Sequence, residues 1–198
     1  MRQTLLRQLS IKAVSPKVVD KLYEIWEKQS ATFLNSRDYM RMAYHLAIMK
    51  PKQWQEILDT QRGRLNNEDQ RREIDFISRA CNPDTQVQQQ LFNELLQAEN
   101  RRIEPWARDM LALLNDPTRE PFSNRYIAPR LDALPEIQRT GDIFFPGYWL
   151  TGLLSGHKST EAKDIVRSWI DTHPSLSPAL MNKLKENAYW LITFPSIP

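Results

Sequence analysis

The sequence predicts an all-α fold, arranged as an irregular HEAT- or armadillo-like stack of antiparallel helix pairs, an α–α superhelix. Two observations predict it. Apolar residues recur at spacings of three and four along most of the 198 residues, which is the period of a helix with one buried face. Clusters of Pro, Gly, Asn and Ser interrupt these runs at short intervals, and no alternating strand pattern of useful length occurs. No strict repeat period is visible, so the stack is expected to be irregular.

The first part of the chain contains clear helix starts and stops. Residues 4–13 are expected to be the end of an element rather than the start of a domain. Serine or asparagine caps a helix N-terminus and proline suits the first turn, so starts are expected at Ser15-Pro16, Asn35-Ser36 and Asn66–Asp69. The residue before proline avoids helical geometry, and glycine ends helices, so breaks are expected at Lys50-Pro51, Gly63 and Asn82–Asp84.

The second part continues with apolar stripes. Its clearest stripe is Ile103, Trp106, Ala107, Met110, Leu111 and Leu114, which Asn115–Pro117 ends. Ser123 is expected to cap a helix that Pro129 and Pro135 kink or segment. Further helices are expected over Val87–Leu96, after the cap Ser159 and after Ser177-Pro178, with His173-Pro174 as a break.

Composition and organisation narrow the class of protein. Apolar residues make up 41% and charged residues 26%, which is typical of a folded domain. No long linker occurs, so we expect a single helical domain over residues 1–192 and a C-terminal tail over 193–198. The longest apolar run is far below the roughly 18 residues of a membrane span, so none is expected. The first nine residues lack the features of a signal peptide, and the sequence indicates no compartment.

Catalytic and metal-binding motifs are absent from the sequence. The histidines are His45, His157 and His173, and none has a His or Cys partner at ligand spacing or begins a His-Glu-x-x-His motif. There is no Gly-x-Ser-x-Gly elbow and no phosphate loop. Cys81 follows an apolar helical run and is expected to be a small buried hydrophobe. We therefore expect no catalytic residue, metal or cofactor in this chain.

Arginine and tryptophan together can indicate nucleic-acid binding, because bases stack on aromatic rings beside phosphate-binding arginines. The densest arginine pairs are Arg71-Arg72 and Arg101-Arg102. Acidic residues lie close to both pairs, most tryptophans fall on predicted core faces, and the formal net charge is only +3. A solvated surface explains these arginines better than a nucleic-acid partner does.

The least generic stretch is Glu136–Leu150, where glycines and aromatic residues concentrate. One interpretation is a tight corner, in which Gly141 ends one helix, Asp142 caps the next turn and the aromatic residues fill the core. The other is the lining of a substrate cavity, with Arg139 binding a carboxylate. Both interpretations stay open for the six candidates, which are Arg139, Asp142, Phe144, Phe145, Tyr148 and Trp149.

Three segments together carry a family resemblance. Glu136–Leu150, Glu104-Pro105-Trp106 and Arg167–Pro174 resemble the C-terminal helical domain of aminopeptidase N-like zinc metallopeptidases, in their bacterial branch. Earlier segments also resemble it, so the similarity covers nearly the whole chain: Ser15–Trp26, Asp59–Arg72 and Arg79–Pro83.

The resemblance implies a role beside other domains. Members of this family have a β-rich domain and a thermolysin-like catalytic domain that holds zinc, and the helical domain follows them. The zinc and substrate-amine motifs are absent here, so the chain is expected to be an inactive piece of a longer enzyme. The resemblance implies a cap on the catalytic cleft that limits access to short peptides, with Arg139 and the aromatics of Phe144–Trp149 at or near the cavity. Its partners would be the catalytic domain of the same polypeptide and the peptide substrate.

Two other classes remain as alternatives. A free-standing helical-repeat scaffold would have polar caps at both ends and a self-contained fold. A helical-repeat nucleic-acid-binding protein would need a continuous basic concave face, which the near-neutral charge argues against.

Overall fold

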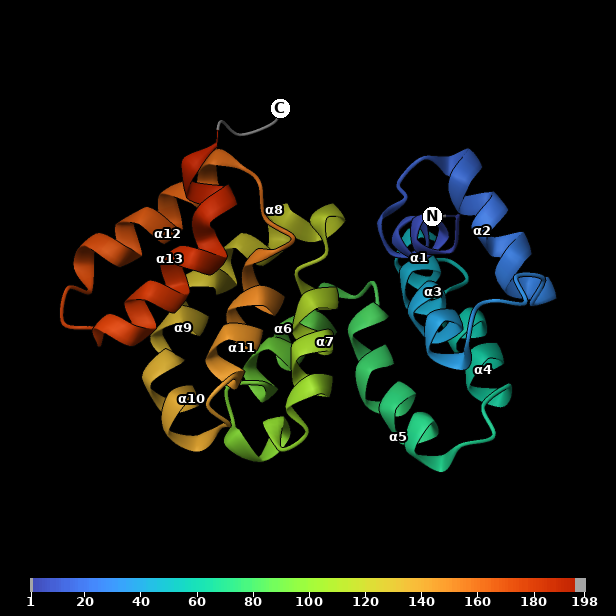
Figure 1. The fold of residues 1–198 in the computed structure, drawn as a ribbon, viewed down its shortest axis with the longest axis horizontal. Helices are drawn as coiled ribbons and strands as arrows, with labels where there is room; N and C mark the ends of the chain where they lie inside the picture. The colour runs from blue at the N-terminus through green and yellow to red at the C-terminus, as the bar shows by residue number, and fades with distance from the viewer. Residues whose placement is uncertain (1, 195–198) are drawn as a thin grey trace. The chain divides into compact units, whose positions relative to one another are not determined.

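The computed structural model describes residues 2–194, and every regular element in that range is helical (Figure 1). The all-α prediction is confirmed for these residues, among which there is no strand. The α-helices are α1 (Arg2–Lys12), α2 (Pro16–Lys28), α3 (Ser36–Met49), α4 (Trp54–Gly63), α5 (Glu68–Ile77), α6 (Thr85–Glu94), α7 (Glu104–Leu114), α8 (Glu120–Ser123), α9 (Ile127–Asp132), α10 (Leu134–Thr140), α11 (Phe145–Leu154), α12 (Thr160–Thr172) and α13 (Pro178–Thr193). Short 3-10 helices join some of them: η1 (Ser78–Cys81), η2 (Ala98–Arg101), η3 (Pro117–Arg119) and η4 (Asn124–Tyr126).

The chain divides into two compact units, Met1–Asp84 and Thr85–Pro198. The HEAT-like order of helix pairs and the single domain over 1–192 stay predictions. The predicted tail begins at the last residue of α13, and residues 195–198 of it lie outside the described residues.

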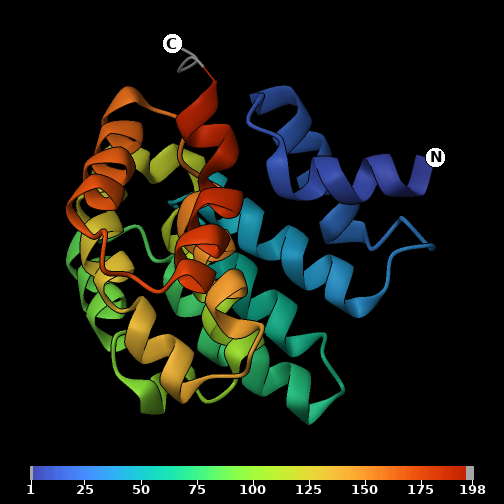
Figure 2. The same ribbon diagram turned by 60° about the vertical axis from the view of Figure 1, so that its left-hand side comes forward.

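The first unit is organised around α3. Nine of the ten side chains over Tyr39–Ile48 are buried inside the unit, and the exception is the exposed Arg41. A helix that is apolar on nearly every side needs neighbours on every side. α1, α2 and α4 supply them, as the two views of the ribbon show (Figures 1 and 2).

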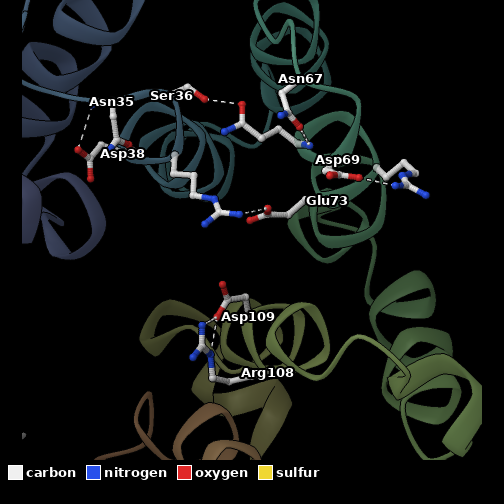
Figure 3. Close-up of polar contacts among 11 residues, drawn as sticks. Asn35, Ser36, Asp38, Asn67, Asp69, Glu73, Arg108 and Asp109 are labelled. Atoms are coloured by element: carbon white, nitrogen blue, oxygen red, sulfur yellow. Dashed lines mark hydrogen bonds and ion pairs between the residues drawn. The ribbon is translucent and has the colours of Figure 1, made fainter.

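Asparagine side chains cap the N-termini of α3 and α5 (Figure 3). The Asn35 side chain accepts a hydrogen bond from the Asp38 backbone N–H at 2.9 Å, and the Asp38 carboxylate accepts one from the Asn35 N–H at 3.1 Å. This reciprocal capping box satisfies two backbone donors that a helix start leaves open. Asn67 caps α5 in the same sense by accepting from the Gln70 N–H. The helix starts predicted at these two asparagines are confirmed.

The second unit is organised around α11, which packs against α7 and α13. Trp149, Leu150 and Leu153 on α11 are fully buried. At Gly152 an added Cβ would come within 2.8 Å of the Arg108 carbonyl oxygen of α7. Only glycine lets the two helix backbones approach this closely.

Two expectations for this unit are wrong. Ser123 does not cap a helix: it is the last residue of α8 and is fully buried, and η4 continues the chain without an extended capping residue. Ile103 is not on the buried face of α7: it precedes the helix and is 47% exposed, so the buried stripe begins at Ala107. The segmentation expected around Pro129 and Pro135 is confirmed, because α9 and α10 are separate helices.

Candidate functional site

The candidate site is the corner between α10 and α11, where Gly141 is the C-cap of α10. A Cβ at this glycine would lie 2.7 Å from the Phe145 ring and 3.0 Å from a Glu104 carboxylate oxygen. That oxygen accepts a hydrogen bond from the Asp142 backbone N–H at 2.7 Å. Glycine is required here by close approach, and the glutamate at the start of α7 satisfies a backbone donor of the turn.

Asp142 shapes the turn that begins α11. Its carboxylate accepts a hydrogen bond from the Phe144 N–H at 2.9 Å, and its carbonyl accepts one from the Phe145 N–H at 3.0 Å. Pro146 occupies the first turn of α11, where its missing N–H is harmless. The predicted local roles of Gly141 and Asp142 are confirmed.

Two of the six candidate side chains belong to the core. Phe145 is 1% exposed and meets the buried Trp149 ring edge-on, at 6.2 Å between centroids. The Trp149 indole N–H donates to the Arg130 carbonyl at 3.1 Å. The Arg101 guanidinium lies 5.7 Å from the centroid of the same ring and is paired with Glu136. Phe145 and Trp149 therefore hold the corner in place from inside and present nothing to a ligand at the surface.

The other four candidates, Arg139, Asp142, Phe144 and Tyr148, are exposed and lie with Ile143 around the same corner. We call these five residues the corner surface. Ile143 is 75% exposed and Phe144 is 64% exposed, which is unusual for side chains of this size. Among residues 4–194, neither Arg139 nor Asp142 has an ion-pair partner. The corner surface thus combines exposed apolar groups with one charge of each sign that has no ion-pair partner among the described residues.

Neighbouring helices support the edges of the corner surface. The Arg108 guanidinium of α7 lies 5.7 Å from the centroid of the Tyr148 ring and is paired with Asp109 at 2.6 Å (Figure 3). Lys183 of α13 donates to the Ile143 carbonyl oxygen at 3.4 Å. These contacts hold the Ile143 backbone and the Tyr148 ring, and they leave the Ile143 and Phe144 side chains exposed.

Sequence reasoning missed Ile143 and Glu104 as parts of this corner. Ile143 directly precedes Phe144 and Phe145, and no pattern in the sequence marks it as exposed. Glu104 did carry a signal, because it precedes Pro105 at a helix start and a carboxylate there favours the helix dipole. Its bond to Asp142, 38 residues further on, is a tertiary contact that spacing does not predict.

The remaining chemically active side chains serve the fold. Cys81 is buried as predicted, and a ring nitrogen of the buried His45 lies 2.8 Å from the Ala13 carbonyl oxygen. Arg72 and Arg101 are paired with carboxylates, those of Asp69 and Glu136. In the part of the chain that the structure describes, no group of three or more His, Cys, Asp or Glu side chains is arranged to hold a metal ion. No helix over residues 2–194 is long and apolar enough to cross a membrane.

Comparison of the chain with protein-family models, with curated proteins and with solved structures gives no match. The fold, the corner surface and the resemblance of Glu136–Leu150 are therefore the features that bear on the function of the chain.

Proposed function

We propose that this chain is the non-catalytic helical domain of a zinc-dependent aminopeptidase, which caps the catalytic cleft and limits the access of peptide substrates. The observation that carries the proposal is the corner surface. It lies in Glu136–Leu150, the most specific part of the resemblance, and it presents apolar side chains and unpaired charges to solvent. Contiguous exposed apolar groups of this kind mark interaction sites more often than ordinary surface.

The division of roles within the stretch supports the proposal. Phe145 and Trp149 are buried and rigidify the corner, so the exposed residues are held in a fixed arrangement. A pre-ordered surface binds with a smaller loss of conformational entropy than a mobile one. In this proposal the Arg139 guanidinium binds a carboxylate of the peptide, and Phe144 and Tyr148 contact its apolar side chains. The zinc and the catalytic groups belong to the catalytic domain of the same polypeptide.

The test uses the full reading frame that encodes this chain. The purified protein is assayed for zinc-dependent release of N-terminal residues from peptides of increasing length. We expect activity in the wild-type protein, and an R139A variant in which kcat/KM changes by about fivefold or more for some peptide lengths and little for others. R41A is the matched control, because Arg41 is exposed in the first unit and has no ion-pair partner among residues 4–194.

Two outcomes would contradict the proposal. A full-length protein with no zinc-dependent peptidase activity would remove the family assignment, and a free-standing helical-repeat scaffold would then be the better interpretation. An active enzyme in which R139A and R41A have the same kinetics at every peptide length would remove the corner surface from the substrate path.

A further inference from the structure

A second polar cluster in the same unit lies at the other end of α11, around the buried side chain of His157. The imidazole ring is enclosed between the end of α7, the start of α8 and η4, and the start of α12. Its Nδ1 atom lies 2.9 Å from Asn124 Oδ1, and its Nε2 atom lies 3.0 Å from Asn115 Oδ1. Both ring nitrogens therefore face an amide oxygen.

The orientation of both asparagines is fixed by their other bonds. The Asn124 amide nitrogen donates to the Glu161 carboxylate at 2.7 Å, and the Asn115 amide nitrogen donates to the Leu111 carbonyl at 2.9 Å. Turning either amide over would place its oxygen against another oxygen. Both amide oxygens consequently remain directed at the ring, where each can only accept a hydrogen bond.

A neutral imidazole carries one N–H, so it can donate to only one of these oxygens. The second ring nitrogen would then hold a lone pair against a buried oxygen about 3 Å away, with no hydrogen between them. A buried polar contact left unmade in this way is destabilising. The doubly protonated imidazolium donates to both oxygens and removes the conflict.

The charged groups around the ring favour the same state. A Glu120 carboxylate oxygen lies 3.8 Å from Nδ1, and Glu161 lies behind Asn124. Glu120 also accepts hydrogen bonds from the Lys158 and Ser159 backbone N–H groups, at 2.8 and 2.7 Å. Burial of the glutamate acts to raise its pKa, but these bonds from Ser159 and Lys158 outweigh it, and the pKa is lowered from 4.5. Glu120 is therefore an anion at neutral pH.

Burial of the ring acts in the opposite direction. It lowers the pKa of His157 to about 4, although the Glu120 carboxylate opposes this effect. Burial thus outweighs the Glu120 carboxylate and favours a neutral ring at pH 7, whereas the two asparagine oxygens favour a charged one. Hydrogen bonds from a charged donor are roughly twice as strong as neutral ones, and here there are two of them beside a fixed anion.

We infer that His157 is held as a doubly protonated imidazolium in the folded chain at neutral pH, and that with Glu120, Asn115 and Asn124 it forms a proton-dependent clasp. The clasp joins α7, α8 and α12, so loss of one proton breaks a contact between helices that are distant in the sequence. A site with this property responds to alkaline pH, which releases the proton from the ring. This inference is independent of the proposed function, because it concerns the second unit by itself.

The experiment measures the ring nitrogens of the full chain by long-range ¹H–¹⁵N correlation at pH 7.5, with H157Q to assign the signals. We expect both His157 nitrogens to show the similar shifts of an imidazolium. A single-tautomer pattern, with one protonated and one bare nitrogen at pH 7.5, would overturn the inference. If H157Q fails to fold, correlation of the ring to the assigned His157 backbone identifies its signals, so the wild-type spectrum still decides this point.

Two further variants test the pairing with the carboxylate. E120Q removes the adjacent charge, and we expect the proton affinity of His157 to fall about tenfold or more. D132N is the matched control, because Asp132 lies 3.6 Å from a different histidine, the partly exposed His173. D132N should leave the His157 signals unchanged. An E120Q titration identical to that of wild type, or an equal effect of D132N, would contradict the clasp.

Discussion

The two ends of α11 share one hydrogen-bonding arrangement, but one end exposes apolar side chains and the other buries a histidine. At each end a Glu-Pro pair starts a helix, and the glutamate accepts a hydrogen bond from a loop N–H 38 residues further along the chain: Glu104 from Asp142, and Glu120 from Lys158. A glycine lies at each loop as well, Gly141 at the first and Gly156 at the second. The first loop leaves Ile143 and Phe144 in solvent, whereas the second buries His157 between two asparagines.

One end of α11 therefore serves the stability of the unit, and the other end exposes side chains to solvent. At the Gly156 end, every ring nitrogen and both glutamate-bound N–H groups are used within the unit, so this end has little left to offer a partner. At the Gly141 end, the backbone is held as firmly, but the side chains of the corner surface make few contacts within the described chain. We therefore expect mutations at the Gly156 end to act on stability, and mutations of the corner surface to act on binding.

The largest effect is expected for G156A. An added Cβ would lie 1.6 Å from the Asn115 carbonyl oxygen, and backbone must move to accommodate it. We expect a loss of at least about 3 kcal/mol of unfolding free energy, or failure to fold. G147A is the control, since nothing lies within 4 Å of its Cβ and alanine in a helix gains about 0.5–1 kcal/mol. Urea unfolding followed by circular dichroism measures both, and equal effects would contradict the difference between these glycines.

The next effect distinguishes two adjacent phenylalanines at the corner. F145A removes a ring that is 1% exposed, and truncation of a buried phenylalanine costs about 3–5 kcal/mol. F144A removes an exposed ring and should change the unfolding free energy by no more than about 0.5 kcal/mol. If F144A proves as destabilising as F145A, Phe144 is packed in solution and the corner surface is smaller than described.

The paired glutamates give a third comparison. Glu120 is 6% exposed and accepts from two backbone donors, whereas Glu104 is half-buried and accepts from Asp142 alone. E120Q should cost about 1–3 kcal/mol, because glutamine is a weaker acceptor for two part-buried N–H groups. E104Q should cost less than about 1 kcal/mol. Thermal unfolding of both variants at pH 7 tests the order, and the reverse order would contradict it.

Local signals in the sequence predict most of the helices. Asn35, Asn67, Ser159 and Ser177 are caps in the structure as predicted, because capping depends on residues three positions apart. The prediction that Ser123 caps a helix is wrong for a physical reason. A buried hydroxyl inside a series of short helical turns has the same sequence context as a cap, and only tertiary packing separates the two.

Only part of the candidate site could be predicted from the sequence. The glycine and aspartate of the corner follow from turn chemistry, and so does the burial of some aromatic residues. Which of two neighbouring phenylalanines turns inward depends on the rotation of α11 against α7, and no local pattern carries that information. The hydrogen bonds that Glu104 and Glu120 accept from loops 38 residues away also depend on tertiary packing, which no local pattern predicts.

The smallest predicted effect concerns acid. The pKa of Glu120 in the folded chain is lowered, so its ionised form contributes stability above the unfolded value of 4.5, and that contribution is lost as the pH falls through the folded value. The part of the difference in unfolding free energy between wild type and E120Q that depends on this charge should therefore shrink below about pH 4.5. E104Q provides the comparison, measured by urea unfolding at each pH. A difference between wild type and E120Q that grows on acidification would show that the Glu120 carboxylate destabilises the joint, and the two ends of α11 would then not share one stabilising arrangement.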